Sequence, residues 1–314
     1  MRTTTLISLS LAAAIVLTAC GEEAPTFPSS SPASELAKGG VGKGKGKAGD
    51  KVVYTHKFAD GLLDIYTMNP DGTNATRLLP ASGYSNWDAR WTPDHNKIAF
   101  VSSRTGASKI FIMNANGTNP VQLTFGGCND RHPAPSPDGT KIAFQRPCAG
   151  GGLFVVNTDG SGLTQVTFNS ADQQPTWLPD GSRIIFANNL ETPTGIYRVK
   201  LDGTDRFPIQ SCVTAICQAP MVSPDGTRLA WWSPGNDGQI TIRTFATDTY
   251  VELAHLGPES YYPPTFSPDG TKLIFTAGPY ATDYELWSVN AADGFGLTRL
   301  TTLAGPDMGP SWHR

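Results

Sequence analysis

The residues of this sequence best suited to acid–base or metal chemistry are its histidines and a recurring set of aspartates. The five histidines are scattered along the chain, at His56, His95, His132, His255 and His313. No His-Glu-x-x-His motif, which would bring two imidazoles to one face of a helix around zinc, occurs among them. The recurring aspartates each follow a proline: Asp138, Asp180, Asp225 and Asp269. Aspartate in such turns hydrogen-bonds to the nearby backbone, so we expect these carboxylates to cap turns and not to form a catalytic set.

Motifs for covalent or phosphate chemistry are also missing. No Gly-x-Ser-x-Gly nucleophile elbow is present, and Gly150-Gly151-Gly152 lacks the Lys-Ser/Thr pair of a phosphate-binding loop. The formal net charge is −3, with 24 Lys and Arg against 27 Asp and Glu. That balance leaves no excess of cations to neutralise phosphates, which argues against a nucleic-acid partner. We expect no cofactor and no metal.

The aspartate turns belong to an internal repeat of about 44 residues. Their prolines, with an earlier one in Thr92-Pro93-Asp94, are spaced by 44, 42, 45 and 44 residues. Each turn is followed by an alternating apolar run such as Lys141-Ile142-Ala143-Phe144. A second apolar block follows and usually ends in Asp-Gly or Asn-Gly, and a short apolar segment closes the repeat. Repetition at this period indicates a propeller or a solenoid.

Each repeat reads as four short strands joined by tight turns. Asp-Gly and Asn-Gly tolerate the positive φ that hairpin turns need, so they mark chain reversals. Four antiparallel strands in about 44 residues, repeated side by side, are typical of the blades of a β-propeller. The segment 51–314 holds six such periods. We therefore predict an all-β, six-bladed β-propeller of four-stranded antiparallel blades.

The two ends of this segment predict how the ring closes. The first copy, Lys51-Val52-Val53-Tyr54, has no inner strand before it. The C-terminus supplies an unmatched one, Pro310-Ser311-Trp312, which corresponds to Pro175-Thr176-Trp177 of a complete repeat. We expect the C-terminal strand to complete blade one, because this removes a free sheet edge.

These motifs carry a family resemblance. The pattern Pro-x-Trp-Ser-Pro-Asp-Gly-Thr-Lys-Ile-Ala-Phe, then Ile-Tyr-x-Met-Asn-x-Asp-Gly, then Arg-x-Leu-Thr, resembles the WD40-like (PD40) propeller repeats of the TolB family over residues 51–314. The resemblance implies a periplasmic propeller that binds proteins. TolB itself carries an α/β domain before its propeller, whereas a tether precedes the propeller here.

Residues 1–50 are predicted to deliver and anchor the protein. Arg2, an apolar run and Leu17-Thr18-Ala19-Cys20 resemble the signal peptide and lipobox of bacterial lipoproteins, which implies cleavage and lipid attachment at Cys20 within 1–20. The alternative is an ordinary secreted protein with an incidental cysteine. Gly21, where an aspartate would favour the inner membrane, favours the outer membrane. Residues 21–50, Pro/Ser-rich and then Gly/Lys-rich, predict a flexible tether.

Four cysteines remain for the propeller in an oxidising compartment, where disulfides form. Cys128 precedes the inner strand of a blade and Cys148 follows the paired second strand, so a hairpin brings them level. Cys212 and Cys217 share one loop. We predict the disulfides Cys128–Cys148 and Cys212–Cys217. A zinc site is the weaker alternative, because the Cys-x-x-Cys spacing is absent.

One face of the disc carries the long loops that enter each blade and join its second and third strands. We call it the long-loop face, and the opposite one, with the Pro-Asp and Asp-Gly turns, the short-turn face. Long loops on a rigid scaffold commonly carry binding residues. Exposed aromatic residues with scattered charges are typical of protein-binding surfaces. The candidates for a partner-binding face are Tyr84, Trp87, Asp88, Asp130, Arg131, His132, Asp172, Trp232, Tyr261, Tyr262, Tyr280, Asp283, Tyr284 and Asp307.

Two functions remain open at this point. The favoured one is a non-catalytic, monomeric envelope lipoprotein that binds a protein partner, in the periplasm or at the cell surface. The alternative is a glycan-active lyase or hydrolase with its site at the mouth of the propeller channel. Its first candidate residues are Asp88, His132 and Gln174, which occupy equivalent positions in successive repeats.

Overall fold

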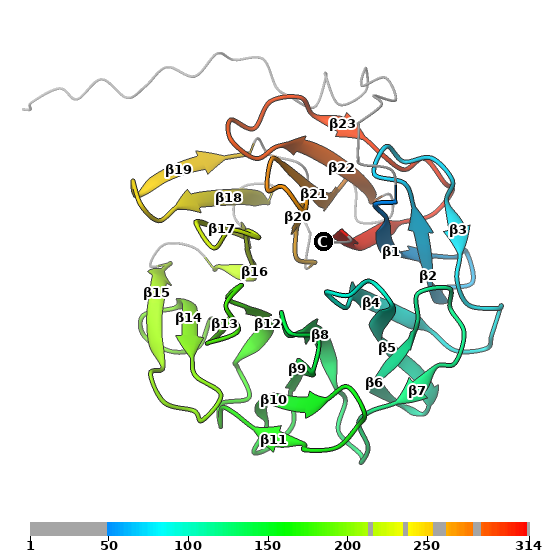
Figure 1. Cartoon of the computed structure of the whole chain (residues 1–314), viewed down its shortest axis with the longest axis horizontal. Helices are drawn as coiled ribbons and strands as arrows, with labels where there is room; N and C mark the ends of the chain where they lie inside the picture. Colours follow the sequence, from blue (N-terminus) through cyan, green and yellow to red (C-terminus); the bar gives the residue numbers. More distant parts are fainter. Residues whose placement is uncertain (1–48, 213–215, 235–237, 254–261, 279–283, 313–314) are drawn as a thin grey trace, which may run out of the picture. The chain divides into compact units, whose positions relative to one another are not determined.

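The computed structural model describes residues 49–212, 216–234, 238–253, 262–278 and 284–312. In these ranges the chain forms six four-stranded antiparallel sheets, arranged around a common centre like the blades of a propeller (Figure 1). No helix within these ranges is long and apolar enough to cross a membrane. The predicted all-β, six-bladed fold is confirmed. The predicted leader, including Cys20, and the predicted tether up to residue 48 lie outside the described residues.

Each blade begins with an inner strand near the centre of the ring and continues outward through three more. Blade one contains β24 (Asp307–Trp312), β1 (Val52–Lys57), β2 (Leu63–Met68) and β3 (Thr76–Arg77), and blade two contains β4 (Asn86–Trp91), β5 (Lys97–Thr105), β6 (Ala107–Asn114) and β7 (Val121–Gln122). Blade three contains β8 (Arg131–Pro135), β9 (Lys141–Arg146), β10 (Gly152–Asn157) and β11 (Thr164–Gln165), and blade four contains β12 (Gln173–Trp177), β13 (Ile184–Asn188), β14 (Gly195–Val199) and β15 (Phe207–Ser211). Blade five contains β16 (Gln218–Val222), β17 (Arg228–Ser233), β18 (Gln239–Thr244) and β19 (Thr249–Glu252), and blade six contains β20 (Thr265–Phe266), β21 (Lys272–Ala277), β22 (Glu285–Asn290) and β23 (Thr298–Arg299).

The Pro-Asp turns are held as the sequence predicts. In blade three, the Ser136 hydroxyl donates to the Asp138 carboxylate at 2.5 Å, and the Thr140 N–H donates to the same carboxylate at 3.0 Å. The Lys141 N–H in turn donates to Ser136 Oγ at 3.0 Å. Gly139 has a φ of +69°, a backbone conformation that residues with a side chain rarely adopt. The repeated aspartates therefore fix hairpins between the inner and second strands.

The core lies between neighbouring blades, where the two faces of each sheet pack on the next. Phe100 of β5, for example, packs in one buried cluster with Val53 and Ile65 of blade one. The equivalent aromatic residue of the second strand is buried in every blade, at Tyr54, Phe100, Phe144, Phe186, Trp231 and Phe275. A ring in which every sheet is covered on both faces explains why the second strands are apolar at successive positions and not only at alternate ones.

The ring is closed by the C-terminal strand. β24 pairs with β1, with Val52 opposite Trp312 and His56 opposite Asp307. At one end of this pair, His56 Nδ1 lies 2.7 Å from Asp307 Oδ1, and both side chains are buried. Figure 1 shows β24, coloured red, beside β1 and near the centre of the ring. The predicted closure of blade one by both ends of the propeller segment is confirmed.

Candidate functional site: the axial cavity and the long-loop face

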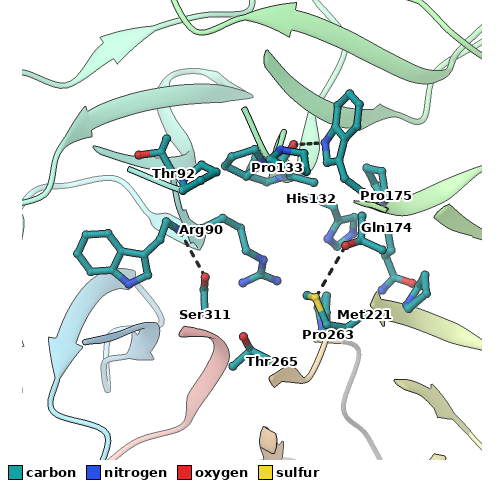
Figure 2. A pocket seen from close by; sticks show the side chains of 18 of the residues that line it. Arg90, Thr92, His132, Pro133, Gln174, Pro175, Met221, Pro263, Thr265 and Ser311 are labelled. Carbon is teal, nitrogen blue, oxygen red and sulfur yellow. Dashed lines mark hydrogen bonds between the residues drawn. The ribbon is translucent and has the colours of Figure 1, made fainter. Parts of the chain in front are cut away.

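A cavity of about 80 Å³ lies among the inner strands. All six inner strands contribute to it, and Figure 2 shows its walls. The lining residues run along these strands, from His132 and Gln174 near the starts of β8 and β12 to the turn prolines Pro93 and Pro137. A volume of this size holds a few water molecules or one small polar group.

Each of four inner strands carries a bulge beside the cavity. Asp88, His132, Gln174 and Ala219 have φ between +53° and +54°, and the sheet register shifts at each of them. Asp and His tolerate this left-handed conformation better than most residues, which explains their presence at such positions. Gly309 takes the same place in β24, with a φ of +64°. The predicted equivalence of Asp88, His132 and Gln174 thus reflects their shared backbone conformation at the bulge.

The bulges join neighbouring blades through hydrogen bonds. The Asp88 N–H donates to Thr55 Oγ1 of blade one at 3.1 Å, and the Ala219 N–H donates to Gln174 Oε1 of blade four at 2.8 Å. In blade one, the Gly309 N–H donates to Thr276 Oγ1 of blade six at 3.1 Å. The Gln174 side chain therefore fixes the position of the next inner strand.

Asp88, Arg90 and His132 form one charged cluster at the cavity. Asp88 Oδ1 lies 3.0 Å from Arg90 Nη2, and Asp88 Oδ2 lies 2.9 Å from His132 Nδ1. Burial works to raise the pKa of the Asp88 carboxyl, but the Arg90 and His132 charges outweigh it and hold that pKa below its usual range. The cluster ties β4 to β8.

His132 and Gln174 thus line the cavity, whereas Asp88 does not, and all three are engaged in contacts between blades. Among the residues that the structure describes, no group of three or more His, Cys, Asp or Glu side chains is placed to hold a metal ion. The hydrogen bonds and ion pairs of the three candidates explain their residue types by the packing of the ring.

Four acids predicted for the exposed long-loop face are buried instead. Asp88 is 1% exposed, and Asp130, Asp172 and Asp307 are each 0% exposed. Asp130 accepts hydrogen bonds from Arg146 Nε at 2.7 Å and Nη2 at 2.9 Å, and Asp172 binds Arg206 at 2.8 Å. The expectation that these acids belong to an exposed surface is wrong, because they connect the start of an inner strand to neighbouring strands. A buried carboxylate needs such partners to remain ionised.

The predicted aromatic residues divide into three groups. Trp232 is buried at 2% exposure and lies in a core cluster, so its prediction as an exposed residue is also wrong. Tyr84, Trp87, Tyr262 and Tyr284 are partly exposed, and the Tyr84 ring lies 5.0 Å from the Arg104 guanidinium. Burial, with the nearby Asp88 charge, raises the pKa of Tyr262 to about 12. Arg131 is exposed, whereas Tyr261, Tyr280 and Asp283 lie outside the described residues.

Both predicted disulfides are present. Cys128 is bonded to Cys148 and Cys212 to Cys217, with Cα atoms 6.0 Å apart in each pair. Behind the first disulfide, the buried Lys109 ammonium donates to the Cys128 carbonyl oxygen and lies 3.4 Å from Asp130. The loop into blade three is therefore fixed by a covalent bond and by a buried charge.

The long-loop face also exposes apolar residues that sequence reasoning missed. Phe125, Phe168 and Leu190 are 66%, 81% and 83% exposed. Phe125 and Phe168 follow the outer strands of blades two and three at equivalent positions, directly after Leu-Thr and Val-Thr. Leu190 joins the second and third strands of blade four, and the adjacent Asn169 and Glu191 side chains are hydrogen-bonded at 2.7 Å, so Phe168 and Leu190 are neighbours. The sequence feature that could have identified Phe125 and Phe168 is a bulky apolar residue just beyond the last strand of the repeat.

Comparison with known protein families agrees with this architecture. A family model described as "TolB beta propeller domain" (PD40) matches residues 47–216, more than half of the chain. The chain belongs to the TolB beta-propeller domain family. The solved structure of TolB from Acinetobacter baumannii superposes with a TM-score of 0.74 at 21% identity, over 85% of this chain and 67% of that one. At this identity the likeness shows the fold.

Curated relatives match only part of their own length. A "Protein TolB homolog" of Chlorobium luteolum is 32% identical over 139 residues, which are 44% of this chain and 31% of the relative. The "Uncharacterized peptidase YuxL" of Bacillus subtilis is 26% identical over 207 residues, 62% of this chain and 30% of the relative. An oligogalacturonate lyase solved in complex with manganese shares the fold, with a TM-score of 0.55 at 15% identity over 79% of this chain and 78% of that one. The chain thus spans about a third of the length of these two curated relatives.

Proposed function

We propose that this protein is a non-catalytic lipoprotein of the bacterial cell envelope whose propeller binds a protein partner through its long-loop face. The observation that carries the proposal is the exposure of Phe125, Phe168 and Leu190 on the loops of three consecutive blades. Large apolar side chains that remain in water on an otherwise well-packed scaffold mark interaction sites. Membership of the TolB propeller family supports a role in the envelope.

Order in the loops supports the same face. The Cys128–Cys148 disulfide and the buried Lys109 hold the loop that follows Phe125, and the Asn169–Glu191 hydrogen bond holds Phe168 beside Leu190. Residues that are already ordered lose less conformational entropy when a partner binds. The long-loop face therefore presents its apolar side chains at a low entropic cost.

The lipid anchor is a second part of the proposal. Leu17-Thr18-Ala19-Cys20 and the tether of residues 21–50 would hold the propeller near the membrane, and Gly21 favours the outer one. A single acylated cysteine carrying several chains anchors without spanning the bilayer. In this arrangement the propeller is free to reach a partner within the range of its tether.

Substitution on the two faces tests the partner-binding role. An affinity tag inserted in the tether is used to recover the protein, with bound material, from envelopes of its native cells. Phe168→Ser and Leu190→Ser should each weaken partner recovery, by about 1–3 kcal/mol of binding free energy where the residue is a hot spot. Trp87→Ala and Tyr284→Ala test the aromatic residues predicted from sequence in the same way.

The matched control is Phe295→Ser, which makes the same change at a 73% exposed phenylalanine in a turn of the short-turn face. This variant should retain the partner, because the short-turn face is outside the proposed interface. The proposal is rejected if Phe295→Ser releases the partner while Phe168→Ser and Leu190→Ser retain it.

A further inference from the structure

The Arg90 guanidinium reaches into the axial cavity from β4. Figure 2 shows it in the middle of the channel, with Ser311 and Thr265 on one side and His132 and Gln174 on the other. The side chain is buried at 8% exposure. Its Nη1 donates to the carbonyl oxygens of Ala89 at 3.0 Å and Gly309 at 3.1 Å, so the backbone of two adjacent inner strands fixes its position.

The contacts of Arg90 do not use all of its donors. Nη2 lies 3.0 Å from Asp88, and within the described ranges no hydrogen bond or ion pair involves Nε. Guanidinium binds a carboxylate through two parallel N–H groups, and the edge formed by Nε and Nη2 has the required geometry. Asp88 meets only one of these two nitrogens.

Other hydrogen-bond donors line the same cavity. The Thr265 hydroxyl oxygen accepts the Trp312 backbone N–H at 3.1 Å, and the Ser311 hydroxyl oxygen accepts the Trp91 N–H at 3.4 Å. Because each hydroxyl oxygen already acts as an acceptor, its own proton is available to a ligand. The wall opposite His132 thus offers two hydroxyl donors.

We propose that this cavity is a binding site for a single carboxylate group. A carboxylate supplies two acceptor oxygens, which complement the Nε and Nη2 donors of the Arg90 guanidinium and the neighbouring hydroxyl groups. A cavity of about 80 Å³ accommodates such a group but little more. The prolines around it, including Pro133, Pro175 and Pro263, form rigid apolar walls for the adjoining carbon chain. The carboxylate belongs to a small free acid or to the C-terminus of a peptide.

The site is distinct from the proposed partner face. Its lining runs along the inner strands, from His132 and Gln174 to Pro93 and Pro137 in the Pro-Asp turns. Phe168 and Leu190 lie on loops of the long-loop face and do not line the cavity. Loss of one binding activity therefore leaves the other intact.

Calorimetric titration of the folded propeller tests the proposal with four probes: acetate, succinate, a tripeptide with a free C-terminal carboxyl group, and the same tripeptide with a C-terminal amide. Saturable binding of acetate and succinate, one per chain, identifies a small acid as the source. Binding of the free-acid tripeptide alone identifies a chain terminus. The amidated tripeptide should bind at least tenfold more weakly than the acid.

Two variants localise the binding. Arg90→Gln removes the guanidinium. Ala134→Leu adds bulk at a lining residue of β8 without deleting a side-chain hydrogen bond. The second variant keeps the test valid if Arg90→Gln misfolds. Each should reduce carboxylate affinity at least tenfold. Arg183→Gln, which makes the same charge change at a residue paired with Asp205 away from the cavity, should bind as the wild type does. The proposal is overturned if no probe saturates, if acid and amide bind equally, or if a folded Ala134→Leu protein binds with unchanged affinity.

Discussion

The closure of the ring depends on a buried ion pair whose removal has a calculable cost. His56 and Asp307 are cross-strand partners in β1 and β24, 2.7 Å apart and 4% and 0% exposed. Changing His56→Ala leaves the Asp307 carboxyl group buried without its hydrogen-bond partner. Breaking a buried pair in this way costs about 3–5 kcal/mol of unfolding free energy. For a domain of this size that corresponds to a fall in Tm of roughly 6–20 °C.

The dependence of this cost on pH distinguishes the effect of the Asp307 charge from the effect of losing the packing contacts of His56. Burial is the main cause that raises the pKa of Asp307 above its ordinary value, even with His56 beside it. A carboxyl group with a raised folded-state pKa favours folding below its unfolded pKa of about 3.9, and that contribution is lost as pH rises through the folded value. The His56→Ala variant should therefore lose more stability at pH 8 than at pH 4. Loss of the ring contacts of His56 with Phe58 and Tyr66 does not change with pH in this way.

Urea unfolding of the wild type, His56→Ala, Asp307→Asn and the double variant measures the coupling. The double variant should be more stable than His56→Ala, because the isolated charge is gone. A His56→Ala cost below about 1 kcal/mol, or full additivity of the two changes, would refute the view that this pair holds the ring closed.

Three further outcomes follow from the structure and the sequence. Deletion of residues 307–314 should expose the edge of β1 and give aggregates by light scattering; a monomer that melts like the full chain would contradict closure by β24. Cys20→Ser should move the protein from the membrane to the soluble fraction of fractionated cells, and unchanged fractionation would contradict the anchor. The hydrogen bond from Ser223 is the main cause that lowers the pKa of Asp225 to about 2, so its stabilising effect should be present above pH 4 and disappear as pH falls through about 2. In a plot of the urea unfolding midpoint against pH, Asp225→Ala should reduce the fall of the midpoint at acid pH. An unchanged fall would contradict the turn-capping role.

The regular features of the fold could be predicted because each is encoded locally. A Pro-Asp turn followed by an alternating run fixes a hairpin within about ten residues, and repetition of that unit sets the number of blades. The Cys128–Cys148 disulfide follows from the same register, since the hairpin brings its two ends level. Closure by Pro310-Ser311-Trp312 could be predicted because the first repeat lacks an inner strand and the end of the last repeat supplies an extra one.

The site was harder to predict because its side chains are determined by contacts between strands that lie apart in the sequence. Asp130 and Asp172 are charged residues of loops, which are usually exposed, yet each is buried against an arginine from elsewhere in its blade, Arg146 of β9 or Arg206 just before β15. Their shared position, seven residues before the turn proline, was the available signal of a structural role. Phe125 and Phe168 were missed for the opposite reason, because apolar residues at a strand end are usually buried.

The most direct test of the account is photocrosslinking in living cells with a photoreactive phenylalanine analogue at residue 168 or at residue 295. Both positions are exposed phenylalanines, one on each face of the propeller. The account predicts a discrete protein adduct from position 168, lost when Leu190 is changed to serine, and no such adduct from position 295. The same adduct from both positions, or an adduct from position 295 alone, would contradict binding through the long-loop face.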